Sequence, residues 1–139
     1  MQILLTKISD AKHRLEIARD DTTRDAIELD HQYCGGIGLL PHQHGAARSK
    51  GLPTDRLKVG EVKRAIVTEK FRGKGIGGKL LRALEQTARN EGFGLLVVET
   101  LRGMEDASRF YEQHGYRRRG LYGLYVEEDS LFFEKPLKE

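Results

Sequence analysis

A glycine-rich, positively charged segment constrains the fold of this 139-residue chain more than any other feature: Arg72-Gly73-Lys74-Gly75-Ile76-Gly77-Gly78-Lys79. A strand-like stretch, residues 62–67, precedes it, and an amphipathic stretch, residues 79–90, follows it. Glycines between a strand and a helix permit a tight turn, and a helix start offers backbone N–H groups and the positive end of a dipole. The pattern therefore predicts a phosphate-binding turn.

Two familiar phosphate-binding loops match this segment only in part. Gly73, Gly78 and Lys79 fit the G-x-x-x-x-G-K pattern of nucleotide hydrolases, but Leu80 stands where that motif requires a Ser or Thr hydroxyl for magnesium. The glycine spacing also fits the dinucleotide-binding pattern. In that fold the first glycine follows the strand closely, whereas the polar run 68–72 intervenes here, and the remaining chain is too short for a second nucleotide-binding half. Both alternatives are disfavoured.

A third pattern fits throughout. Residues 61–77 resemble the acetyl-CoA motif of the GNAT superfamily of N-acetyltransferases, whose core is Arg or Gln, two residues, Gly, one residue, then Gly or Ala. Arg72, Gly75 and Gly77 stand at those places. The resemblance covers most of the chain beyond residue 60 and, loosely, residues 26–41. Its further segments are Phe93-Gly94-Leu95-Leu96-Val97-Val98-Glu99-Thr100, Ala107-Ser108-Arg109-Phe110-Tyr111-Glu112-Gln113-His114-Gly115-Tyr116 and Ser130-Leu131-Phe132-Phe133-Glu134-Lys135-Pro136-Leu137.

The resemblance implies a single GNAT-like acetyltransferase domain over residues 1–139, of the α/β (α+β) class: a mixed, mostly antiparallel central sheet flanked by helices. Helical spacing predicts one helix over residues 79–90 that ends at Gly92, and a second helix from residue 105 or 106 to 114. The apolar face of the first helix is formed by Ile76, Leu80, Leu81, Leu84 and Ala88. Its polar residues, Lys79, Arg82, Glu85 and Arg89, lie mostly on the other side.

The strands are predicted from short apolar runs and from turn residues. Residues 95–98 form a continuous apolar run typical of a buried strand. Residues 116–126 and 131–134 are expected to pair antiparallel, with 127–130 as their turn. Residues 26–29 and 33–40 are expected to form a hairpin, and residues 41–58, with their Pro and Gly breakers, a loop.

The N-terminal segment departs from the family, which usually places two helices of the acceptor site after the first strand. Residues 13–19 alternate like a strand, and residues 20–23 have turn composition. A meander of three strands, 3–8, 14–19 and 26–29, is the preferred prediction, and a single helix over residues 10–19 is the alternative. The acceptor wall is therefore expected to be shortened and β-rich.

Acetyl-CoA is implied as the donor, and no metal is required. Backbone groups of Ala65, Ile66 and Val67 would hold the acetyl group and the pantetheine arm, and the side chains of this stretch read as a buried strand. Backbone amides of Gly73, Lys74, Gly75, Ile76, Gly77 and Gly78 would bind the pyrophosphate, with charge from Arg72, Lys74 and Lys79.

Proton transfer falls to other residues. Tyr111 corresponds to the tyrosine that the family often uses as general acid, since a phenol remains protonated near neutral pH. Glu61 stands where some members carry a glutamate base and is the candidate general base here. Glu99, expected to face a loop, is a third candidate. Each residue also has a purely structural interpretation. Tyr111 would then be a core aromatic residue, and Glu61 a polar residue at the start of a strand.

Composition limits the other functions. With 24 Lys and Arg against 21 Asp and Glu, and no aromatic stacking platform interleaved with the run 117–119, nucleic-acid binding is not expected. No apolar run approaches a membrane span, and one cysteine, Cys34, suits a reducing compartment, so a cytoplasmic protein is expected. His42 and His44 lack a third metal ligand at a convincing spacing and are expected to be solvated.

The sequence thus predicts an acetyl-CoA-dependent N-acetyltransferase that acts on a primary amine of a small molecule or peptide. Its alternative is a non-catalytic CoA-binding or regulatory module on the same fold. A homodimer, in which a second subunit supplies the acceptor wall, stays open.

Overall fold

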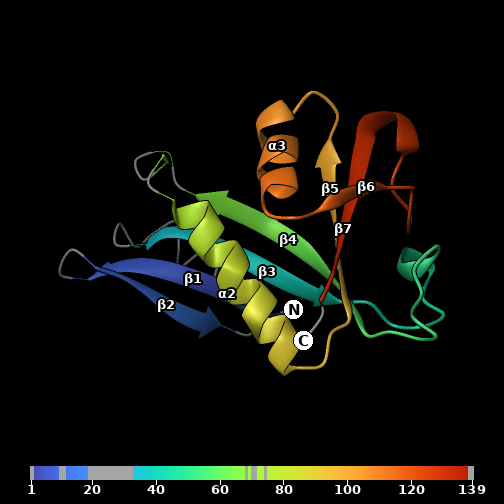
Figure 1. Ribbon diagram of the computed structural model, residues 1–139, viewed down its shortest axis with the longest axis horizontal. Helices are drawn as coiled ribbons and strands as arrows, with labels where there is room; N and C mark the ends of the chain where they lie inside the picture. Colours follow the sequence, from blue (N-terminus) through green and yellow to red (C-terminus); the bar gives the residue numbers. More distant parts are fainter. Residues whose placement is uncertain are drawn as a thin grey trace. The chain divides into compact units, whose positions relative to one another are not determined.

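The computed structural model describes residues 2–9, 12–18, 33–67, 69, 72, 73 and 75–137 (Figure 1). The chain divides into two compact units. The first unit comprises Met1–Leu40 and Lys63–Ala88, and the second unit comprises Pro41–Val62 and Arg89–Glu139. Strand β4 (Val59–Val67) contributes residues to both units.

The strands of the first unit lie in the order β2-β1-β3-β4. Strand β1 (Gln2–Ser9) pairs antiparallel with β2 (Lys12–Ala18) on one side and with β3 (Tyr33–Pro41) on the other. The first two strands of the predicted meander are therefore confirmed, and the alternative helix over residues 10–19 is wrong. The third predicted strand, residues 26–29, lies outside the described residues.

Helix α2 (Ile76–Asn90) confirms the predicted amphipathic helix and begins three residues earlier than expected. Its whole predicted apolar face is buried. Glu85, expected on the polar side, is also buried, with 4% of its surface exposed. A Cβ added at Gly35 of β3 would lie 2.6 Å from the Ile66 carbonyl oxygen and 3.2 Å from Leu80 of α2, so glycine lets β3 approach both elements closely.

The second unit continues from the first residues of β4 in the order β4-β5-β7-β6. Strand β5 (Leu95–Leu101) runs parallel to β4, in a register from Val59↔Leu95 to Glu61↔Val97. Strand β7 (Ser130–Pro136) is antiparallel to both β5 and β6 (Arg117–Arg119). Helix α3 (Glu105–Gln113) confirms the second predicted helix, and Gly115 follows it with φ +89°. The predicted mixed sheet with helices is confirmed.

The predicted strand 116–126 is correct only in its first part. After Arg119 the chain leaves the sheet: the N–H of Gly123 donates to the Lys50 carbonyl, and a Cβ at Gly123 would lie 2.6 Å from the Arg48 carbonyl oxygen. Gly123 also has φ +67°, which L side chains rarely adopt. The chain then forms a 3₁₀ helix (Glu127–Asp129) before β7, where a turn to residue 130 was expected.

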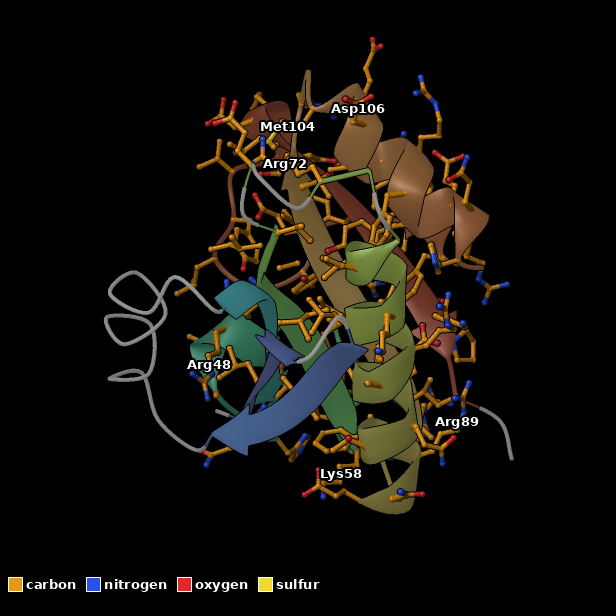
Figure 2. The ribbon with its side chains drawn as sticks, turned by 90° about the vertical axis from the view of Figure 1, so that its left-hand side faces the viewer. Arg48, Lys58, Arg72, Arg89, Met104 and Asp106 are labelled. Carbon is orange, nitrogen blue, oxygen red and sulfur yellow. The ribbon has the colours of Figure 1, made fainter. Side chains whose placement is uncertain are left out.

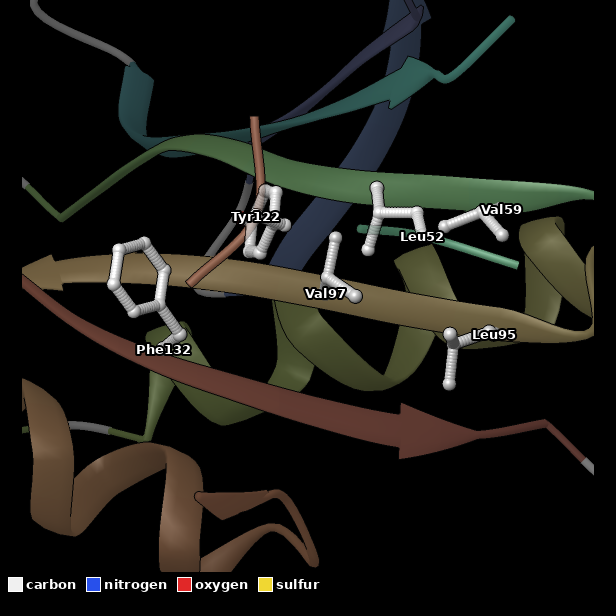
Figure 3. Packing of buried hydrophobic residues seen from close by; sticks show 6 residues of the cluster. All are labelled: Leu52, Val59, Leu95, Val97, Tyr122 and Phe132. Carbon is white, nitrogen blue, oxygen red and sulfur yellow. The ribbon is translucent and has the colours of Figure 1, made fainter. Parts of the chain in front are cut away.

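The core of the second unit joins its loop to its strands. The predicted loop 41–58 is irregular apart from Pro41, which ends β3, and a 3₁₀ helix (Ala47–Ser49). One buried cluster in Figure 3 takes residues from this loop, from β4, β5 and β7, and from the segment after β6: Leu52, Val59, Leu95, Val97, Tyr122 and Phe132. Burial of such side chains anchors the segments that carry the polar groups described next.

Candidate functional site

The glycine-rich turn of the first unit has a left-handed backbone at two of its glycines. Gly73 and Gly75 have φ of +79° and +77°, in the region that favours glycine. The N–H of Lys79 donates to the Gly75 carbonyl at 3.1 Å, so this bond closes the first turn of α2. The three N–H groups after Gly75 therefore have no acceptor within the helix, which is what an anion at a helix start uses.

The charged residues of the turn are placed only in part. Arg72, labelled in Figure 2, is exposed, and its Nε donates to the Val67 carbonyl at 3.1 Å. This bond fastens the turn to the end of β4. Lys79 lies in the first turn of α2, whereas Lys74 is outside the described residues.

The stretch proposed to hold the acetyl group lies on β4, as predicted, but its side chains are less buried than a core strand's. Ala65 is exposed and Ile66 is 44% exposed, while Val67 is half-buried. The expectation of a buried strand is therefore wrong for these side chains. The proposed contacts are made by backbone groups, on which side-chain burial does not bear.

Tyr111 lies on α3 with 5% of its surface exposed. Its ring packs against Phe110, Tyr116 and Phe133, with centroid separations of 5.2, 5.4 and 6.4 Å. Burial raises the pKa of Tyr111 from 10.0 to about 12, because the charged phenolate is disfavoured in an apolar environment. The phenol therefore keeps its proton at physiological pH.

Glu61 is the centre of a buried polar group in the second unit. Its side chain is 2% exposed and accepts hydrogen bonds from three side chains. His42 Nε2 donates to Oε1 at 2.8 Å, while the hydroxyls of Tyr122 and Tyr125 donate to Oε2 at 2.9 and 2.6 Å. The polar residue expected at a strand start is thus a buried carboxylate with specific donors, and we call these residues, with Ser49, the carboxylate network.

His42 connects the carboxylate to the loop. Its Nδ1 lies 2.8 Å from Ser49 Oγ, and its ring meets the Tyr122 ring edge-on at 6.1 Å. His42 is 8% exposed, so the expectation of a solvated histidine is wrong for this residue. Because Nε2 faces an acceptor, the hydrogen-bond pattern assigns a proton to Nε2. Among the described residues, no group of three or more His, Cys, Asp or Glu side chains is arranged to hold a metal ion.

Burial and the carboxylate together raise the pKa of the two tyrosines that contact Glu61. Burial, followed by the charge and the hydrogen bond of Glu61, raises the pKa of Tyr122 well above its usual range. Burial, followed by the hydrogen bond to Glu61 and its charge, does the same for the pKa of Tyr125. Both hydroxyls therefore remain protonated and act as donors, which stabilises a negative charge on Glu61.

Other charged candidates form ordinary pairs. Glu99 lies on β5 and accepts a hydrogen bond from Ser130 Oγ at 2.6 Å. In the arginine run, Arg117 and Arg119 pair with Glu134 at 3.2 and 2.8 Å. These contacts give both residues structural roles in the second unit.

The structure therefore gathers the predicted residues only in part. The described hydrogen bonds connect Glu61 with His42, Ser49, Tyr122 and Tyr125, and they do not connect it with Tyr111. Sequence reasoning gave the two tyrosines no role and considered His42 only as a metal ligand. One signal was available: a glutamate within the apolar start of this strand, residues 59–62, needs buried donors.

Comparison with known proteins extends this description. Residues 5–116 match the acetyltransferase (GNAT) family. Over 81 residues the chain is 43% identical to the IAA acetyltransferase of Azospirillum brasilense. The aligned region covers 56% of this chain and 52% of the relative. The chain thus spans about half the length of that curated relative.

Solved structures show the same fold. A protein of Klebsiella pneumoniae assigned to the acyl-CoA N-acyltransferases aligns with a TM-score of 0.64 and 28% identity, covering 91% of this chain and 72% of the other. The NatC complex bound to Gag peptide and CoA contains a chain that aligns with a TM-score of 0.61 and 22% identity, covering 78% and 64%. The chain belongs to the GNAT acetyltransferase family. None of its described helices is long and apolar enough to cross a membrane.

Proposed function

We propose that this protein is an acetyl-CoA-dependent N-acetyltransferase that transfers an acetyl group to a primary amine of a small molecule or peptide by direct attack. The observation that carries the proposal is the family match across residues 5–116, which includes the turn with positive φ at Gly73 and Gly75. Membership in an acetyltransferase family supports the reaction class. The acceptor amine is proposed only at the level of its chemical class.

In this proposal the turn binds the acetyl donor, acetyl-CoA. Residues 73–78 present backbone N–H groups to the pyrophosphate of acetyl-CoA, and Arg72, Lys74 and Lys79 add positive charge. A Cβ at Gly73 or Gly75 would meet nothing within 4 Å, which leaves open space beside the backbone where a phosphate needs it. Backbone groups of residues 65–67 hold the acetyl group and the pantetheine arm.

Tyr111 and Glu61 move the protons. The acceptor amine must lose a proton before it attacks the thioester carbonyl, and the sulfur that leaves must gain one. A phenol with a pKa raised to about 12 keeps a proton to donate to that sulfur, which supports Tyr111 as general acid. Glu61 is the candidate base that finally receives the amine's proton.

The alternative is a non-catalytic CoA-binding or regulatory module. The antiparallel pair β1–β2 favours it, because residues 12–18 form a strand where the family usually builds an acceptor wall from helices. A homodimer in which a second copy supplies that wall stays a prediction. Binding of acetyl-CoA without turnover of any amine would favour the module.

Two measurements test the proposal: calorimetric binding of acetyl-CoA, and CoA release with a panel of primary amines. In a Tyr111→Phe variant we expect an unchanged Kd for acetyl-CoA and a kcat lowered about 100-fold, the scale of general acid catalysis. Tyr116→Phe is the matched control, since Tyr116 is a buried tyrosine of the same aromatic cluster, and its kcat should stay near the wild-type value. Absence of binding at millimolar acetyl-CoA would reject the function altogether.

A further inference from the structure

Glu61 is too deeply buried to take a proton from an acceptor amine by direct contact. Only 2% of its surface is exposed, and its two carboxylate oxygens already accept hydrogen bonds from His42, Tyr122 and Tyr125. If Glu61 is the final proton acceptor of the proposed reaction, another group must carry the proton to it. The network itself contains such groups, because a hydroxyl can accept one proton while it releases another.

The two tyrosines differ in their access to the surface. Tyr122 is 1% exposed, with its ring inside the core cluster, whereas Tyr125 is half-buried and only packs against that cluster. The ring of Tyr125 packs against the rings of Tyr122 and Phe132, with centroid separations of 5.6 and 5.9 Å, and these contacts orient it. Its hydroxyl lies 2.6 Å from Glu61 Oε2, the shortest bond that this carboxylate makes among the described contacts. Tyr125 is therefore the less buried of the two tyrosines that donate to the carboxylate.

We propose that Tyr125 is a catalytic residue of the transferase proposed above and carries the proton of the acceptor's ammonium group to Glu61. The phenol oxygen of Tyr125 accepts a proton from the ammonium nitrogen while its own O–H proton passes to Glu61 Oε2. The products of the step are a neutral amine, an intact Tyr125 phenol and a neutral Glu61 carboxylic acid, so charge and protons balance. This inference rests on the proposed function.

The surroundings of the network favour a concerted step. The pKa of Tyr125 is raised by its burial and then by Glu61 and Glu99, so a free tyrosinate is unfavourable and the phenol must gain a proton as it loses one. Only a small fraction of neutral amine is needed at any moment, because attack on the thioester consumes it. His42, held by Ser49, fixes the other carboxylate oxygen and is a positioning residue.

Tyr125→Phe tests the relay, because it removes the hydroxyl and keeps the ring. Each variant is assayed with a primary alkylamine that the wild type acetylates and with its β,β-difluoro analogue, whose ammonium is far more acidic and is mostly neutral at the assay pH. We expect Tyr125→Phe to lower kcat/KM about 100-fold for the alkylamine, as loss of acid–base catalysis does, and much less for the analogue. Tyr122→Phe, which removes a hydrogen bond to the same Oε2, should lower both rates equally.

The outcomes separate this inference from the function on which it rests. Equal losses for the two amines in Tyr125→Phe, or an alkylamine rate near that of the wild type, would overturn the relay and leave the transferase standing. Binding of acetyl-CoA without turnover by the wild type would overturn both. Leu124→Ala, a change at a 74% exposed neighbour, should leave both rates unchanged. If Tyr125→Phe does not fold, 3-fluorotyrosine at position 125 replaces it, and an unchanged alkylamine rate then overturns the relay.

Discussion

The glycine turn of the first unit and the carboxylate network of the second unit are built in opposite ways. The turn is exposed at Gly73 and Gly75, and its geometry lies in the backbone, with positive φ at both glycines and open space where a Cβ would be. The network is buried, and its geometry lies in side chains that loops bring to Glu61 from 19 to 64 residues away. A local sequence pattern specifies the first, whereas only tertiary packing creates the second.

This difference has an energetic consequence. A side chain added to the turn costs backbone strain, because the left-handed region is unfavourable for residues other than glycine. Removal of the carboxylate from the network leaves buried donors without an acceptor, and each such group loses its solvation without compensation. Substitutions in the network should therefore be the more destabilising.

The largest expected effect follows from Glu61→Ala. His42, Tyr122 and Tyr125 would lose their shared acceptor, and breaking a buried pair of this kind lowers the free energy of unfolding by about 3–5 kcal/mol. Urea denaturation followed by circular dichroism measures the change. Glu112→Gln on the exposed side of α3 is the control, and it should stay within about 0.5 kcal/mol of the wild type. Similar losses in both variants would show that the network does not stabilise the fold.

The same contrast explains what the sequence could reveal. The turn, helix α2 and the buried strand β5 were predictable because glycines, helical spacing and an apolar run are local signals. The sequence could not predict the burial of Glu85 or the end of β6 at Arg119. Both depend on contacts between distant segments, such as the hydrogen bond from the Gly123 N–H to the Lys50 carbonyl.

The candidate site shows the same division. Glu61 was selected from the resemblance and its place in a strand, but its partners were not. His42 seemed a solvated loop residue, since no local feature indicates that the loop folds over β4 and makes the bond from the His42 N–H to the Val59 carbonyl. Tyr122 and Tyr125 lie in a segment that was predicted as a continuous strand, where they would have pointed to different faces.

A second prediction uses the buried phenols of the second unit, which should make its stability sensitive to alkaline pH. The pKa of Tyr111 rises from the ordinary value of 10.0, taken for the unfolded chain, to about 12 in the folded protein. The folded state therefore holds this proton more tightly. The stability from the protonated phenol is complete below pH 10 and is lost as the pH rises towards 12, by about 2–3 kcal/mol in total.

Tyr111→Phe removes this dependence. Its free energy of unfolding should therefore fall less steeply than that of the wild type between pH 10 and pH 11.5, where Tyr111 titrates in the unfolded chain but not in the folded one. Tyr122 and Tyr125 are present in both proteins, so the difference in slope isolates Tyr111. Urea denaturation at a series of pH values measures it, and parallel curves would contradict the raised pKa.

The smallest expected effect follows from Gly75→Ala in the turn. A non-glycine residue at φ +77° costs about 1–2 kcal/mol, and this cost is conformational, so it should be the same at pH 7 and at pH 10.5. If the turn binds the pyrophosphate, the strain should also displace backbone N–H groups and weaken acetyl-CoA binding in calorimetry.

Gly45→Ala in the second unit is the matched control, because Gly45 has φ +83° and equally open surroundings. It should lose similar stability and keep full affinity for acetyl-CoA, since its strain lies outside the proposed cradle. Equal losses of affinity in the two variants would mean that the turn contributes no specific contact, and the contrast between a backbone-built donor site and a side-chain-built proton site would fail.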